Sequence, residues 1–354
     1  MPSSQAITLV VGSSAWRNWT SYEVAAQFET PADSWRIEVR APSSAQLAQL
    51  QLGAVVILMV ERSTVLRGRL DRRELRRTTK GGTVVVLSGR DLAGQLVDCT
   101  TPTSWAWRNI SLAGLAAKAV SELGLAVTVD AHSDAQVVLP WVKAEQGETY
   151  WQVLERYARK ARLMPWMSPA GALRIGRPDY TSTPVASLIN AISPAKKNQT
   201  NVLEALFVDD ITQRFSSVTV LGQSKGSDSM FGGNAAHLRG EAVDADLAAL
   251  GVARPLVMDD GDLRSSREAR DRAEWEVSHR IYQGRSLEYV VAGHGPTPSS
   301  TWRLDTMVNV YDELAAIEGP WWVAGYRLLR DGSAGSRTAL TLRPPNALLP
   351  PAVS

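Results

Sequence analysis

Apolar and polar positions alternate along the first and last thirds of the chain, a pattern that indicates a mainly β protein. Two early segments, Ile7–Val11 and Trp35–Val39, have the period of a half-buried sheet. The same pattern then predicts a meander of three strands separated by turn residues, at Val55–Val60, Thr64–Leu75 and Thr83–Leu87. Near the end of the chain it predicts four strands, at Leu287–Ala292, Thr306–Tyr311, Trp321–Leu329 and Thr338–Leu342.

Between these β-rich parts, apolar residues fall at helical spacing and predict a small α+β unit. Ser111 is placed to cap the start of one helix and Gly124 its end. Thr149 and Gln152 have the spacing of a capping box, which predicts a second helix beginning at Thr149. Short strands are expected beside them, at Leu125–Val129 and Leu173–Ile175.

The next part of the chain combines strands, a loop and a third helix. Two strands are predicted, at Asn201–Val208 and Ser217–Leu221. Gly222–Gly233 is rich in Gly and Ser and lacks apolar periodicity, so we expect a mobile loop that limited proteolysis cuts first. Ser265 and Glu268 have capping-box spacing, and the helix that they open would pair Glu276 with Arg280 one turn later.

One strand layout occurs twice. Val55–Leu87 and Met307–Leu342 each contain an apolar strand, a charged turn, a long strand, a Gly-containing turn and a short strand that ends near Leu. Any antiparallel meander produces a similar layout. Internal duplication and chance therefore both remain open at this stage.

Composition places the chain among ordinary globular proteins. Its 354 residues suggest two or three domains at a prior of about 150 residues each. A hydrophobic fraction of 44% and a formal charge of +2 provide no overall field for holding nucleic acid or an anionic membrane. The single cysteine, Cys99, fits a reducing cytoplasm. The longest apolar run, Ala54–Val60, is too short to cross a bilayer, so we expect neither export signal nor membrane anchor.

The residue types that carry catalysis form no recognisable constellation. The four histidines lack metal-ligand spacing, and no phosphate-binding loop or Gly-x-Ser-x-Gly motif is present. A cluster of three acids could in principle serve glycoside hydrolysis, but adjacent acids before a helix are usually solvated turn residues. These residues are His132, His237, His279 and His294, and Asp259, Asp260 and Asp262. We therefore predict no catalytic, cofactor-binding or metal-binding residue and no enzyme activity.

The strongest charge feature is a basic cluster interrupted by two acids, Asp71 and Glu74. If Thr64–Leu75 is one strand, three of its arginines share a face and suit pairing with acids of a neighbouring subunit. DNA binding is the alternative, which the absence of interleaved aromatic residues disfavours. The cluster comprises Arg67, Arg69, Arg72, Arg73, Arg76, Arg77 and Lys80. Most of the 12 tryptophans are expected in the core.

Four motifs, in order, resemble those of the baseplate hub proteins of Mu-like contractile-tailed phages. Gly89-Arg90-Asp91-Leu92 with Leu96-Val97-Asp98 resembles the segment that leaves the family's first barrel. The others are Gln213-Arg214-Phe215-Ser216 with Val218–Gln223, then Arg272–Glu276 with Arg280, and finally Gly335–Ala347. The resemblance covers nearly the whole chain, but it departs at Gly293-His294, where the family usually has Gly-Trp.

The resemblance implies a mixed, mainly β fold with two similar antiparallel β-barrels and smaller α+β units. On this basis we expect a first tube-type β-barrel at 1–98, an α+β domain at 99–183, a second tube-type β-barrel at 184–223 and 285–350, and an inserted loop and helix unit at 224–284. It also implies a ring-forming homotrimer whose six barrels match a hexameric tail tube on one face and a trimeric spike on the other.

The implied role is that of a structural hub in the virion, assembled in the bacterial host cytoplasm. Its expected partners are the spike protein and the tail tube or other baseplate proteins, and phage DNA would pass through the channel without specific binding. Two alternatives remain open. One is the hub of a tail-like bacteriocin or secretion apparatus, and the other is a tail-associated cell-wall hydrolase.

Overall fold

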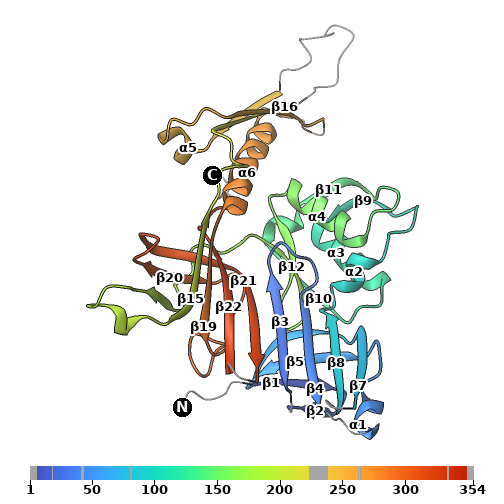
Figure 1. Cartoon of the computed structure of the whole chain (residues 1–354). Coiled ribbons are helices and arrows are strands. Elements are labelled where there is room, and N and C mark those ends of the chain that lie inside the picture. Colours follow the sequence, from blue (N-terminus) through green and yellow to red (C-terminus); the bar gives the residue numbers. More distant parts are fainter. Residues whose placement is uncertain are drawn as a thin grey trace. The chain divides into compact units, whose positions relative to one another are not determined.

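The computed structural model describes residues 6–17, 19–40, 44–79, 82–222, 238–261, 263, 265–332 and 335–348 (Figure 1). The predicted mobile loop after Gly222 lies outside these residues. The chain forms two compact units, and strands predominate in it. The first unit comprises Met1–Ala205, Tyr289–Glu318 and Val323–Thr341, and the second comprises Leu206–Glu288, Gly319–Trp322 and Leu342–Ser354. In the described part of the chain, no helix is both long and apolar enough to span a membrane.

A ten-stranded sheet is the main element of the fold (Figure 1). Eight strands follow in the order β15-β19-β22-β21-β3-β4-β8-β7, and β20 pairs with β21 and with β14. Their bounds are β3 Ser21–Gln27, β4 Ser34–Arg40, β7 Arg72–Thr78, β8 Gly82–Arg90, β14 Ser187–Asn190, β15 Val202–Asp209, β19 Arg285–Ala292, β20 Met307–Asp312, β21 Ile317–Asp331 and β22 Gly335–Arg343. No sheet formed by the described residues closes into a barrel.

The main sheet is amphipathic. Tyr22, Val24 and Ala26 of β3 are buried, and the residues between them are more exposed. β4 repeats the alternation, with Trp35, Ile37 and Val39 buried. The alternation of side chains along a strand places these apolar residues on one face of the sheet and the polar residues on the other.

The main sheet contains one strand order twice. One group of strands runs from β3 to β8, and the other runs from β15 to β22 without β16 to β18, which form a separate sheet. In the main sheet each group is ordered as its first, second, last and next-to-last strand, which gives β3-β4-β8-β7 and β15-β19-β22-β21. The first group leaves two strands out of that run, β5 (Val55–Val60) and β6 (Ser63–Arg69), which pair with each other, and the second group leaves out β20, which pairs with the next-to-last strand, β21. This correspondence favours duplication over chance as the origin of the repeated layout in the sequence.

The prediction of a single strand at Thr64–Leu75 is wrong. β6 lies in a smaller sheet of order β2-β1-β5-β6, with β1 at Ile7–Val11 and β2 at Ser14–Trp16. Leu70 N donates to Ala54 O beside β5, whereas Asp71 N donates to Ser88 O of β8. The chain changes sheets here, where Gly68 and Gly89 bring two backbones together: a Cβ on Gly89 would lie 1.9 Å from Arg69 O.

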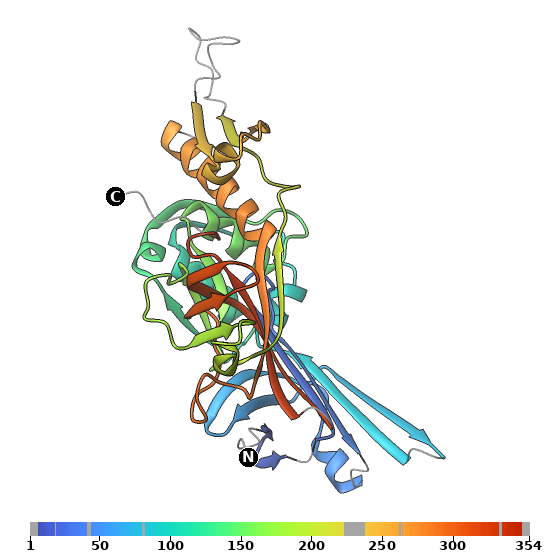
Figure 2. The ribbon, with the colours of Figure 1, turned by 60° about the vertical axis from the view of Figure 1, so that its left-hand side comes forward.

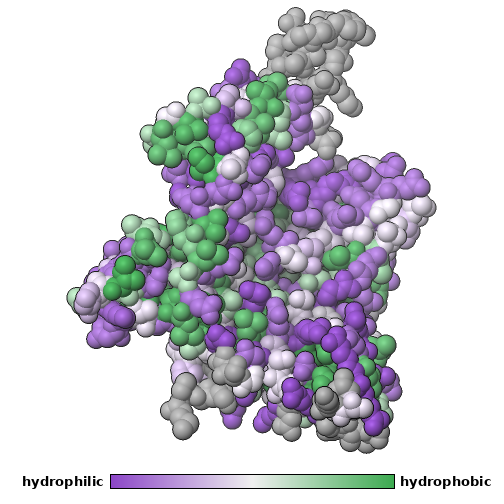
Figure 3. Space-filling model, in the orientation of Figure 1, coloured by the Kyte–Doolittle hydropathy of each residue, from purple (hydrophilic) through white to green (hydrophobic). Residues whose placement is uncertain are grey.

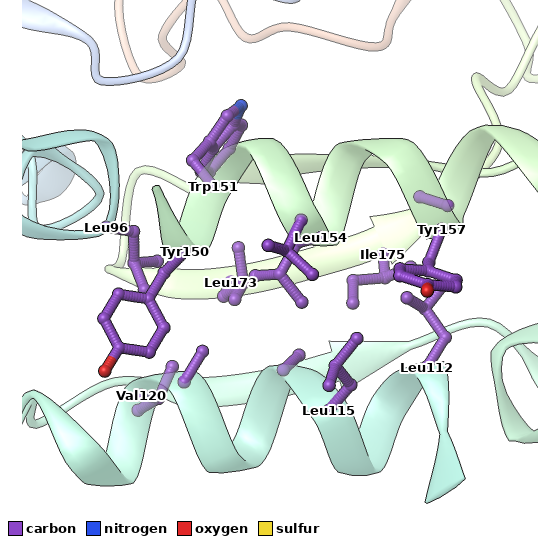
Figure 4. Close-up of a cluster of buried hydrophobic side chains, with 14 of the residues drawn as sticks. Leu96, Leu112, Leu115, Val120, Tyr150, Trp151, Leu154, Tyr157, Leu173 and Ile175 are labelled. Carbon is purple, nitrogen blue, oxygen red and sulfur yellow. The ribbon is translucent and has the colours of Figure 1, made fainter. Parts of the chain in front are cut away.

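The α+β part of the first unit surrounds its own core (Figure 4). α3 (Leu112–Glu122) and α4 (Tyr150–Lys160) face each other through Leu115 and Leu154, with Leu173 beside them. Both predicted N-caps are confirmed, since Ser111 accepts from Gly114 N and Thr149 forms a capping box with Gln152. The other elements are α2 Gly94–Asp98, β9 Ala106–Ser111, β10 Thr128–Ala131, β11 Val138–Lys143, β12 Met164–Met167 and β13 Ala172–Gly176.

In the second unit, a three-stranded sheet of order β17-β16-β18 packs on a long helix. Val218 and Val220 of the sheet contact Ala273 and Val277 of the helix. The predicted cap at Ser265 is confirmed, and Arg280 pairs with Glu276 at 2.6 Å as expected. The elements are β16 Ser217–Gly222, β17 Leu238–Val243, α5 Ala245–Ala249, β18 Pro255–Asp259 and α6 Ser266–Gly284. The remaining short helices are α1 Ser44–Gln49, η1 Ser133–Gln136 and η2 Lys197–Gln199.

The Arg214 motif holds this unit together. Arg214 is 1% exposed, and its Nε and Nη2 atoms donate to the two carboxylate oxygens of Asp244, each at 2.8 Å. Arg280 places its guanidinium 4.7 Å from the centre of the Phe215 ring and donates to Gln213 O. The residues that carry the family resemblance therefore act here as packing and ion-pair residues.

Asp33 and Asp91 form an acid pair beside the start of α2. Asp33 N donates to Asp91 Oδ2 at 3.2 Å, and Asp91 N donates to Asp33 O at 2.8 Å. Burial raises the pKa of Asp91 to about 7. Burial, together with repulsion from Asp91, raises the pKa of Asp33 well above its usual range. The folded state therefore favours the protonated form of this pair.

This pair predicts a pH dependence of stability. Since the folded pKa of Asp91 exceeds its unfolded value, the folded protein holds an extra proton between about pH 4 and 7, and stability falls as pH rises through that window. Asp91→Asn cannot ionise and is expected to lose this component. Urea denaturation of both proteins across this window measures the component as the difference between their free energies of unfolding. Groups that act in the opposite direction, such as His294, whose pKa is lowered by burial, contribute equally to both proteins and cancel. A pH-independent difference would contradict the assignment.

Candidate assembly interface

Several of the residues considered for catalysis make structural contacts. His294 is fully buried, with its Nε2 atom 2.7 Å from Tyr22 Oη, and His279 stacks on Trp275. Asp260 pairs with Arg272 at 3.6 Å. The described residues contain no group of three His, Cys, Asp or Glu side chains arranged to hold a metal ion. His237 and Asp262 lie outside the described residues.

The basic cluster is divided between two sheets, and much of it is used within the chain. Arg69 Nε donates to Gln95 Oε1 at 2.9 Å, and Arg73 Nη1 donates to the carbonyls of Leu47 and Leu50. The guanidinium groups of Arg69 and Arg73 bind backbone and side-chain oxygens of their own chain, and the arginine ladder with a neighbouring subunit stays a prediction.

Four arginines of the cluster, Arg72, Arg73, Arg76 and Arg77, lie on β7, an outer edge of the main sheet. β7 pairs with β8 on one side, and no described strand pairs with its other side (Figure 2). Arg72 and Arg76 flank Glu74 on this strand and form ion pairs with it. Leu75 is 53% exposed although its opposite residue on β8, Val85, is fully buried. β7 is thus a basic edge strand with one uncovered apolar side chain.

The opposite edge of the main sheet is β15, which is exposed on both faces. Every residue of the strand after Val202 is exposed, including Leu203, Leu206, Phe207 and Val208. Figure 3 shows apolar side chains at the surface around this strand. Glu204 and Asp209 lie on it, and Asp210 follows. β15 is therefore an apolar and acidic edge, and a long apolar edge strand without a partner is prone to pair with another chain.

The polar face of the main sheet carries charges of both signs. Glu23 lies opposite Arg36 and is 4.0 Å from Arg327. Arg337 lies 3.4 Å from Glu204 and 3.6 Å from Asp331. These mixed charges leave the face hydrophilic without concentrating one sign on it.

Most tryptophans are in the core, as predicted, including Trp35, Trp302 and Trp322. Trp141 of β11 is 49% exposed, with Arg108 stacked 5.1 Å from its ring centre. The sequence pattern did not single out β15 as a candidate interface. Its run of Leu203, Ala205, Leu206, Phe207 and Val208 lacks the alternation of a strand with one solvated face, and that lack was the available signal.

Four families match successive parts of the chain. Their descriptions are "Mu phage baseplate assembly protein GpP-like, N-terminal" (residues 6–91), "Baseplate hub protein gp44-like, second domain" (residues 93–177), "Tail protein NMB1110-like, third domain" (residues 214–275) and "Mu phage baseplate assembly protein GpP, fourth domain" (residues 265–351). No curated protein matches the chain in sequence.

Solved structures of tail proteins share the fold over nearly the whole chain. The tail protein from Neisseria meningitidis MC58 has a TM-score of 0.82 and 26% identity, with 98% of this chain and 99% of that chain covered. The prophage MuSo2 43 kDa tail protein from Shewanella oneidensis has a TM-score of 0.81 and 23% identity, with 97% and 99% covered. A type VI secretion system component of E. coli has a TM-score of 0.55 and 9% identity, with 98% and 79% covered.

Proposed function

We propose that this chain is the structural hub of a contractile tail baseplate, because successive parts of it match the models of Mu phage baseplate assembly proteins and of gp44-like baseplate hub proteins. In this role it adapts the hexameric tail tube to the trimeric central spike and acts through interface geometry, without catalysis. The matched families are structural baseplate proteins.

The repeated strand order is the observation that carries the adaptor role. Two similar strand groups in one chain give a homotrimer six similar positions around its axis. Such a ring matches sixfold symmetry on one side and threefold symmetry on the other. We propose that the two groups belong to two tube-type barrels, at 1–98 and at 184–223 with 285–350, with 99–183 and 224–284 as the α+β and inserted units.

The amphipathic main sheet supports a channel-lining role. Most of its apolar face is buried within the protein, which leaves the mixed-charge face around Glu23, Arg36 and Arg327 for solvent. A surface with charges of both signs would let DNA pass without tight phosphate binding. Assembly in the bacterial host cytoplasm and incorporation into the virion baseplate complete the proposal.

A second candidate is the hub of a secretion apparatus or tail-like bacteriocin. The likeness to the E. coli component, which is described as similar to bacteriophage T4 tail proteins gp27 and gp5, favours it at the level of the fold. The identity of neighbouring genes separates the two: a capsid and packaging module indicates a phage, and an effector module indicates a secretion apparatus.

The hub proposal predicts a stable complex with the spike protein encoded beside it. Co-expression and size-exclusion chromatography with multi-angle light scattering should give a complex with equal numbers of hub and spike chains and threefold stoichiometry. A tail sheath protein from the same gene cluster serves as the control that should elute separately. A chain that binds neither the spike protein nor the tube protein would refute the proposed function.

A further inference from the structure

An exposed tryptophan marks one face of the α+β part of the first unit. Trp141 lies on β11 and is 49% exposed, and the preceding Val137 and Val138 are 65% and 56% exposed. Most other tryptophans of the chain are in the core. Large apolar side chains that gather at a surface indicate an interaction site, and tryptophan is enriched among the residues that dominate binding at protein interfaces.

The strand that carries this tryptophan is held firmly from its other face. Val142 is fully buried, and Leu139 packs against the same core. Both backbone polar groups of Lys143 are also fixed: its N–H donates to Tyr157 Oη at 3.0 Å, and its carbonyl accepts from Arg156 Nη2 at 2.9 Å. The exposed side chains are therefore presented by an ordered backbone, which lowers the entropy cost of binding a partner.

The exposed face of β9 and β11 also carries two basic residues. Arg108 of β9 lies opposite Trp141, with its guanidinium 5.1 Å from the centre of the indole ring. Lys143 is exposed and lies two residues after Trp141, so the two side chains share one side of the strand. In the described part of the chain neither Arg108 nor Lys143 forms an ion pair, whereas Arg156 pairs with Glu148 nearby. Charges of the opposite sign are therefore expected from a partner.

The free edge of β11 is unsuited to the addition of a further strand. β9 pairs with one side of β11, and no described strand pairs with the other side. Pro140 interrupts this strand, and proline on an edge strand commonly prevents another strand from pairing. A partner would therefore bind through the side chains of the exposed face and would not extend the sheet.

We propose that the exposed face of β9 and β11 binds an acidic segment of another tail protein. Trp141 is the apolar anchor, and Arg108 and Lys143 pair with carboxylates of the segment. Stacking on the indole leaves the edge of the Arg108 guanidinium open, and this edge can donate two parallel hydrogen bonds to one carboxylate. The acidic chemistry follows from the face itself, whereas a tail protein as the source of the segment rests on the proposed function.

An acidic polypeptide suits this face better than a nucleic acid does. A nucleic-acid site follows the phosphate backbone with a track of several basic residues. Here two cations, Arg108 and Lys143, flank one ring, and the adjoining surface is formed by Val137 and Val138. Those valines can contact the aliphatic or aromatic side chains of a polypeptide and bury apolar area against them.

A peptide array identifies the segment. Overlapping peptides that span the spike, the tube and the other tail proteins encoded beside this chain are probed with the labelled full-length protein. We expect the strongest binders to be acidic peptides that contain a large apolar residue. Their binding should weaken at high salt, because the charge pairs that they form lie at the surface.

Substitutions in the full-length protein test which residues bind the strongest acidic peptide. Trp141→Ala should weaken binding about tenfold or more, because it removes the apolar anchor, and Trp141→Phe should restore part of the affinity. Lys143→Glu should also weaken binding, because it brings like charges together. Leu250→Ala, at a residue that is 70% exposed, and Lys197→Glu, at another exposed residue, are the matched controls. Fluorescence anisotropy of the labelled peptide measures the affinity, and circular dichroism checks that each variant is folded.

Two results would overturn this inference. One is that no acidic peptide binds, or that acidic peptides bind the wild-type protein, Trp141→Ala and Lys143→Glu equally well. The other is that a single-stranded oligonucleotide, and no acidic peptide, binds the wild-type protein and is lost in both variants, which would make the face a nucleic-acid site. Either result leaves the hub proposal intact if the chain still forms its complex with the spike. A chain that binds neither the spike nor the tube overturns the proposed function, and the peptide affinities still decide whether the face binds acidic segments.

Discussion

Gly89→Ala is expected to destabilise the first unit severely, at or above the roughly 1–3 kcal/mol of ordinary overpacking. A Cβ on Gly89 would lie 1.9 Å from Arg69 O, and one on Gly68 would lie 2.1 Å from Arg90 O. Both neighbours are backbone atoms, so no side-chain rotation relieves the overlap. The chain changes sheets at this crossing, so the strain falls on both β6 and β8.

Urea denaturation followed by tryptophan fluorescence measures this loss. Gly332→Ala is the control in the same unit, because a Cβ there has no heavy atom within 4 Å. Equal stability of Gly89→Ala and Gly332→Ala would show that the two backbones do not cross as tightly as described.

Arg214→Met is expected to destabilise the second unit by about 3–5 kcal/mol, because it leaves the buried Asp244 carboxylate without its partner. Asp244 is 2% exposed and also caps α5 through the amides of Asp246 and Leu247. The arginine therefore holds in place the residue that begins this helix. Removing one partner of a bidentate, desolvated ion pair of this kind costs far more stability than removing one partner of an exposed pair.

Thermal denaturation and hydrogen exchange of β16 to β18 report on this change. Arg239→Met removes an exposed pair with Glu241 in the same unit and should have little effect. If the two methionine variants have the same stability, the Arg214–Asp244 pair does not hold the unit together.

Local signals in the sequence predicted the helices well. Thr149 and Gln152 form the expected capping box, and Ser111 and Ser265 cap their helices, because these bonds join residues three apart. Leu125–Val129 was placed a few residues early, since the strand begins at Thr128. β3 was missed, because its buried face includes only the small Ala26 after Val24 and one of its two partners, β21, lies some 300 residues away.

Long-range geometry explains what the sequence did not reveal. The break after Arg69 depends on the approach of Gly68 to Arg90, and neither residue signals it alone. The basic cluster serves the chain itself in part, because Arg69 and Arg73 bind oxygens of their own chain.

The central claim is that this chain builds a trimeric ring with six similar positions. Native mass spectrometry of the purified full-length protein, with electron micrographs of the same sample, tests it most directly. The proposed hub should have the mass of three chains and should give end-on views of a ring with six lobes around an open channel. A monomer at all concentrations, with no ring in the presence of the cognate spike, would contradict it.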